Sequence, residues 1–89
     1  MPTLTQSAAP EPATDAELAR SIAAGDQQAF VLLMRRHNQL LFRTARSILR
    51  DDRDAEDAVQ DAYLQAYRSI EQFRGDSRLS TWLTRIVVN

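Results

Sequence analysis

Between residues 14 and 89, apolar side chains recur at intervals of three and four, which is the period of an amphipathic α-helix. A first helix is predicted to begin at Thr14, because Thr14 and Glu17 have the spacing of a capping box. Gly25 is expected to end this helix, since glycine readily adopts the left-handed conformation of a helix C-cap.

A second, longer helix is predicted from the N-cap Asp26 as far as Arg50. Most of its arginines lie off its apolar stripe. The stripe consists of Phe30, Leu33, Met34, Leu41, Ala45, Ile48 and Leu49.

The sequence DDRD interrupts this pattern, and Asp54 is predicted to cap a third helix that Gly75 ends. Its apolar face is formed by Val59, Ala62, Tyr63, Ala66, Tyr67 and Ile70, with Phe73 at its end. A second face has the spacing i, i+3, i+4 and i+7 and is polar apart from one leucine. This face consists of Asp57, Gln60, Asp61 and Leu64.

A fourth helix is predicted to begin at Ser77 or Ser80 and to continue to Asn89, where its pattern is still helical. We therefore expect a C-terminally truncated domain. No proline occurs after residue 13, so long helices are permitted. Together these elements predict an all-α fold, a small orthogonal or antiparallel bundle of about four helices over residues 14–89.

Residues 1–13 are rich in proline, alanine, serine and threonine, and they are expected to be a disordered lead-in. The chain has no cysteine, no basic, apolar signal sequence and no apolar run of the ~20 residues that a membrane span needs. We therefore expect a cytoplasmic protein without membrane insertion.

The net charge of −1 conceals a segregated pattern. Residues 35–50 carry +5 and residues 51–61 carry −5. All eleven basic residues are arginine, which favours bidentate contacts with phosphate or carboxylate. The arginine-rich segment can bind nucleic acid, contact an acidic protein or balance the acids that follow it.

Little in the chain indicates catalysis. His37, the single histidine, lies near an apolar stripe and is interpreted as structural. No serine has a plausible histidine and aspartate partner set, and the acidic run DDRDAED lacks the glycine and ligand spacing of a calcium loop. We expect no enzyme activity, no cofactor and no metal.

Two stretches carry a resemblance to a known family: GDQQAFVLLMRRHNQLLFRTARSIL, and DAEDAVQDAYLQAYRSIEQFRGDSRLSTWLTRIVVN. Their ordered combination resembles conserved region 2 of bacterial sigma factors, most closely the extracytoplasmic-function (ECF) group. The family's second domain, region 4, is absent from this sequence. Housekeeping members carry adjacent aromatic residues where this chain has Arg85 and Ile86, so weaker promoter melting and narrower promoter choice are expected.

The resemblance implies that the third helix docks on the clamp helices of the β′ subunit of RNA polymerase. On pattern alone, its polar face is better interpreted as a solvated helix surface; the resemblance reverses that preference. The matching positions are Asp57, Gln60 and Asp61, with Leu64 and Tyr67 as apolar neighbours.

The resemblance also implies that the following segment opens promoter DNA and holds the non-template single strand of the −10 element. The candidate DNA-binding residues are Ser69, Phe73, Arg74, Arg78, Trp82, Arg85 and Asn89. Trp82 has an alternative role, which is to hold the fourth helix on the bundle by packing. An anti-sigma factor that covers these surfaces is a further expected partner.

An alternative hypothesis is a helical protein-interaction module, a sigma-like adaptor or regulator that does not read DNA. Such a module would still bind a partner through the acidic surface of the third helix, but its binding to −10 DNA would not depend on the base sequence. A small enzyme remains as a third hypothesis with little support, because the sequence has no nucleophile–base pair and no metal cluster.

Overall fold

The computed structural model describes residues 14–89. They form α2 (Asp15–Ala23), α3 (Gln27–Leu49), α4 (Asp52–Ser69), the short 3₁₀ turn η1 (Ile70–Gln72) and α5 (Leu79–Val88). No strand occurs within this range, so the predicted all-α bundle of about four helices is confirmed. The predicted disordered lead-in, residues 1–13, lies outside the described residues.

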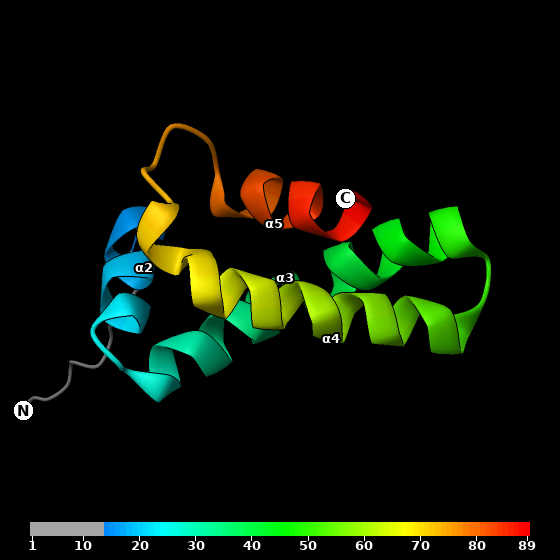
Figure 1. Ribbon diagram of the computed structural model, residues 1–89. Coiled ribbons are helices and arrows are strands. Elements are labelled where there is room, and N and C mark those ends of the chain that lie inside the picture. The colour runs from blue at the N-terminus through cyan, green and yellow to red at the C-terminus, as the bar shows by residue number, and fades with distance from the viewer. Residues whose placement is uncertain (1–13) are drawn as a thin grey trace, which may run out of the picture.

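Helices α3 and α4 lie side by side and run in opposite directions, joined by a tight turn at one end (Figure 1). Helix α5 packs against both of them. Helix α2 packs at the other end, against α3 and η1. The loop between η1 and α5 lies at this second end of the molecule (Figure 1).

The predicted caps at the start of the chain are present. Thr14 Oγ1 accepts a hydrogen bond from the Glu17 N–H at 3.1 Å, and Glu17 Oε1 accepts one from the Thr14 N–H at 3.0 Å. Gly25 has a φ of +99°, the left-handed conformation expected just after a helix. Asp26 Oδ1 accepts from two N–H groups of the first turn of α3, at 3.0 and 3.2 Å.

The junction of α3 and α4 differs from the prediction. Helix α3 ends at Leu49, and Arg50 adopts a φ of +64°, which reverses the chain at once. Helix α4 therefore starts earlier than expected. Its N-cap is Asp51, whose Oδ1 accepts from the Asp54 N–H at 2.9 Å, so the prediction that Asp54 is the cap was wrong.

The predicted boundary before the last loop was also wrong. Helix α4 ends at Ser69 and tightens into η1, so Gly75 does not end it but lies in the loop with a φ of +84°. Helix α5 begins at Leu79, between the two predicted starts Ser77 and Ser80, and its N-cap residue, Arg78, makes no side-chain capping bond. The cap comes from elsewhere in the chain, as described below.

The core lies between the four helices. Its largest fully buried side chains are Leu33, Leu41, Leu79 and Leu83. Ile48 and Leu49, predicted to belong to the apolar stripe, are 53% and 44% exposed, and they border a hollow with Val87 and Val88 of α5. None of the described helices is both long and apolar enough to cross a membrane.

Candidate functional site

One side of α4 presents the five residues that the sequence assigned to polymerase binding, here called the acidic face: Asp57, Gln60, Asp61, Leu64 and Tyr67. All five are exposed, and Leu64 and Tyr67 are 56% and 48% exposed. They share a side because residues three and four apart lie above one another on a helix. The opposite side of α4 is buried against the core through Ala55, Val59, Ala62 and Ala66.

Two hollows between α3 and α4 border the acidic face. One, of about 400 Å³, is lined by Gln60, Leu64 and Tyr67 of α4 and by apolar side chains of α3. The other, of about 360 Å³, is lined by Asp57 and Gln60. Gln60 therefore lies between an apolar and an acidic hollow, an arrangement that can take an apolar side chain and a basic side chain of the same partner.

Aromatic contacts hold the apolar end of the acidic face in place. The ring of Phe30 on α3 meets the Tyr67 ring edge to face, with the centroids 5.2 Å apart. It meets the Tyr63 ring in the same manner at 6.2 Å. Such pairs favour one ring orientation. Tyr67 was predicted to belong to the apolar face of the third helix, but only part of its ring is covered.

Tyr63 anchors this contact to the core. Its hydroxyl donates to Asn38 Oδ1 at 2.6 Å and lies 3.3 Å from the Met34 carbonyl oxygen. Burial raises the pKa of Tyr63 from 10.0 to about 12, because the phenolate would lose its hydration. The hydroxyl is thus a neutral donor at physiological pH.

The second group of predicted residues begins at Ser69, the last residue of α4, and continues through the loop after η1 and along α5 to Asn89. Phe73 and Trp82 are half-buried, and their rings meet edge to face with centroids 5.6 Å apart. Both pack against the core. This contact supports the packing role that was considered for Trp82. Arg74 and Arg78 in the loop are exposed.

The structure does not bring all the predicted DNA-binding residues together. Asn89 borders a hollow with Ala45 and Leu49, at the end of α5 away from the loop. Phe73 contacts Trp82, and Asn89 follows Trp82 by seven residues, which corresponds to a rise of about 10 Å along α5. Arg85 is exposed along this helix, and Ser69 is half-buried at the end of α4.

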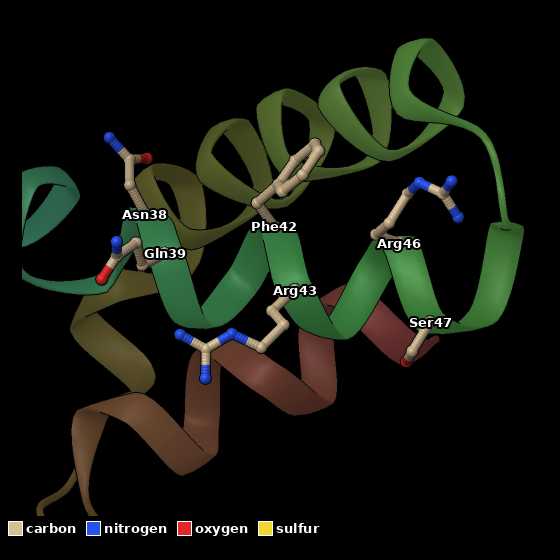
Figure 2. A pocket seen from close by; sticks show the side chains of 6 residues that line it. All are labelled: Asn38, Gln39, Phe42, Arg43, Arg46 and Ser47. Atoms are coloured by element: carbon tan, nitrogen blue, oxygen red, sulfur yellow. The ribbon is translucent and has the colours of Figure 1, made fainter.

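A hollow of about 610 Å³ runs along α3 and includes none of the predicted site residues. Phe42 and Arg46 extend toward α4, whereas Arg43 extends away from it (Figure 2). The Arg46 Nε lies 2.7 Å from Asp52 Oδ1, so one arginine of the basic segment balances the acids that follow it. Both side chains are well exposed, so this ion pair contributes little to stability.

His37 is buried, and its Nδ1 lies 2.7 Å from the Leu33 carbonyl oxygen, one turn earlier in α3. This geometry agrees with the interpretation of His37 as structural. Among residues 14–89, no group of three or more histidine, cysteine, aspartate or glutamate side chains is placed to hold a metal ion.

Sequence reasoning missed the residue that caps α5. Asp15 Oδ2, in the first turn of α2, accepts a hydrogen bond from the Leu79 N–H at 2.8 Å. The two residues are 64 positions apart. Asp15 was interpreted only as an acid at the positive end of its own helix, and no local pattern could have indicated a partner so distant.

Comparison with known proteins places these surfaces in a family. The family model described as sigma-70 region 2 matches residues 33–89. The chain is 51% identical over 76 residues to the ECF RNA polymerase sigma factor SigM of Mycobacterium tuberculosis, which covers 85% of this chain and 39% of SigM. It is 42% identical over 79 residues to the ECF RNA polymerase sigma-E factor of Escherichia coli, covering 89% of this chain and 41% of that protein.

The ECF RNA polymerase sigma-E factor of Haemophilus influenzae is 44% identical over 80 residues, with 89% of this chain and 41% of that factor covered. The chain therefore spans about two fifths of the length of the curated relatives it matches. The matched region includes both the acidic face and the segment from Ser69 to Asn89. The chain belongs to the sigma-70 region 2 family, and its relatives are ECF sigma factors.

Proposed function

We propose that this chain is the region of an ECF sigma factor that attaches the factor to RNA polymerase and engages the promoter −10 element during transcription initiation. It acts by binding and has no catalytic activity of its own. The observation that carries the proposal is the acidic face, where two carboxylates, an amide and two partly exposed apolar side chains lie on one side of α4.

The proposed polymerase partner is the coiled coil of β′ clamp helices. An arginine-bearing helix can place guanidinium groups against Asp57 and Asp61, since charge-assisted hydrogen bonds to carboxylates are strong and directional. Leu64 and Tyr67 supply the apolar contact that such a helix also needs. The neighbouring hollow of about 400 Å³ has room for one of its apolar side chains.

The proposed DNA partner is the non-template single strand of the −10 element. The proposal is supported by the contact between Phe73 and Trp82 and by the exposure of Arg74 and Arg78 in the loop between them. Arginine contacts to phosphate would position the strand, and base contacts would specify it. Asn89, at the far end of α5, would meet a different nucleotide from Phe73.

We expect the full-length protein to act in the cytoplasm, where polymerase and promoter are found. An anti-sigma factor would compete for these surfaces. The partly exposed leucines of α3, Leu32 and Leu40, are 37% and 40% exposed and offer additional apolar contact area.

Polymerase binding is tested with a β′ clamp-helix fragment and two charge-reversed variants. Asp61→Arg is expected to weaken binding at least about tenfold, because losing 1.4 kcal/mol of interaction has that effect. Asp76→Arg, an exposed acid in the loop outside the acidic face, changes the net charge equally and should bind as wild type does. Far-ultraviolet circular dichroism checks that both variants are folded. Normal binding by a folded Asp61→Arg variant would rule out this face.

A second candidate function is the helical interaction module that does not read DNA. It is favoured by the contact between Phe73 and Trp82, since rings that pack on each other need no base to cover them. Binding to a single-stranded −10 oligonucleotide distinguishes the sigma function from the interaction module. Binding that discriminates among base changes supports the sigma function, and absence of such binding supports the module.

A further inference from the structure

A hollow between α2 and the segment of η1 and the following loop borders the proposed strand-binding surface but extends beyond it onto α2. Its volume is about 240 Å³. Ala16, Ala19 and Ala23 of α2 line one side, and Ile70 and Phe73 line the other. The small alanine side chains leave the hollow open. Together with Ile70 and Phe73, they give it a largely apolar floor.

Two arginines, from segments far apart in the sequence, line the same hollow. Arg20 comes from α2 and Arg74 from the loop after η1, and both are exposed. Within residues 14–89, neither forms an ion pair, because the salt bridge there joins other residues. Glu71 is the one acid of the lining, so the hollow carries a net positive charge.

The hollow is continuous with the proposed strand-binding surface. Phe73 lines the hollow and also contacts Trp82. Arg74, a proposed phosphate contact, directly follows it. A strand that lies along the loop therefore reaches the hollow without leaving the protein surface. An apolar floor with guanidinium groups beside it suits a nucleotide, whose base or sugar packs on carbon and whose phosphate accepts from arginine.

We propose that this hollow binds one further nucleotide of the single DNA strand, with Arg20 and Arg74 holding its phosphate. Helix α2 is then part of the strand-binding surface, and Arg20 is a DNA-binding residue that sequence reasoning did not identify. This inference rests on the proposed function, since it needs a strand on the loop. It adds a contact that the acidic face and α5 do not supply.

The test is the salt dependence of binding to a single-stranded −10 oligonucleotide, measured by fluorescence anisotropy. Each phosphate contact contributes about 0.7 to the slope of log K against log salt concentration for a single strand. Arg20→Gln should lower the slope by about that amount. The matched control is Arg53→Gln, which removes an exposed arginine from the first turn of α4, outside the hollow.

Arg20→Lys should keep most of the slope, because a phosphate contact needs the charge more than the guanidinium shape. If Arg20→Gln and Arg53→Gln give the same slope as wild type, the hollow is not a phosphate site, while the proposed function stands. If the folded wild-type chain does not bind the oligonucleotide, the strand-binding half of the proposed function fails and this inference fails with it.

Discussion

Tyr63 connects the core to the acidic face. Its ring is buried, while its hydroxyl donates to Asn38 Oδ1 of α3. A tyrosine in this position serves two purposes: its carbon surface packs on Phe30, and its polar end is satisfied within the protein. Burial of the hydroxyl makes the fold sensitive to alkaline pH.

We predict that stability falls as pH rises from 10 toward 12. The folded-state pKa of Tyr63 is about 12 and its unfolded value is 10.0, so the folded state favours the neutral phenol. Its contribution to stability is fully present below pH 10 and is lost as pH approaches the folded pKa. Urea unfolding at several pH values measures this loss. In Tyr63→Phe, the free energy of unfolding should fall less between pH 10 and pH 12 than it does in the wild type. An equal fall in both proteins would show that Tyr63 is not the titrating group.

At the scale of elements, the start of α5 depends on α2. Helix α5 has no side-chain cap of its own, and the Asp15 carboxylate supplies one across the molecule. Since α5 and the loop before it carry most of the proposed DNA contacts, this hydrogen bond adds to the packing of the buried Leu79 and Leu83 in holding the start of α5 on the bundle.

We predict that Asp15→Ala lowers the free energy of unfolding by about 1 kcal/mol, the usual cost of losing an N-cap. Asp15→Asn, which keeps an oxygen acceptor, should recover most of it. Asp15 also lies in the first turn of α2, so global stability alone does not identify the contact. Hydrogen exchange at the Leu79 amide does: protection should fall in Asp15→Ala, and unchanged protection would show that the contact does not hold α5.

At the scale of the whole molecule, residues 14–89 share one core. Helices α2, α4 and α5 each pack on α3 or its neighbours, and no pair of them forms a separate apolar cluster. The charged groups are distributed differently: α3 carries arginines along its exposed sides, and the acids gather on α4. The fold is therefore one unit with two surfaces of opposite character.

A single core predicts a single cooperative unfolding transition for the described residues. Far-ultraviolet circular dichroism reports on all the helices, whereas Trp82 fluorescence reports on α5 and its contact with Phe73. Both probes should give the same urea midpoint. A Trp82 transition at clearly lower urea would show that α5 detaches first and that the domain does not unfold as one unit.

Much of the fold was predictable because the relevant interactions are local. The capping box of Thr14 and Glu17, the cap at Asp26 and the period of the apolar positions each involve residues within a few turns of one another. The shared side of Asp57, Gln60, Asp61 and Leu64 on α4 was predictable for the same reason, because helical periodicity decides which residues share a side. Tyr67 was assigned by this period to the apolar face, yet it is 48% exposed. Its role in polymerase binding stays a prediction.

The sequence-based predictions were wrong where an unusual backbone conformation or a residue distant in the sequence determined the structure. Arg50 adopts a left-handed conformation that is uncommon for a residue other than glycine, and this moved the cap of α4 from Asp54 to Asp51. Ile48 and Leu49 follow the helical period, but their burial depends on which elements pack against that end of α3, and periodicity does not specify this.

The sequence by itself determined the all-α class, the number of helices, the apolar stripes and the separation of acidic from basic segments. Only the tertiary structure decided that Asp15 caps α5, that Arg20 and Arg74 line one hollow and that Ile48 and Leu49 of the apolar stripe stay partly exposed. The physical reason is one of range: helical periodicity and capping act over about four residues, whereas these arrangements depend on how the finished helices pack against each other.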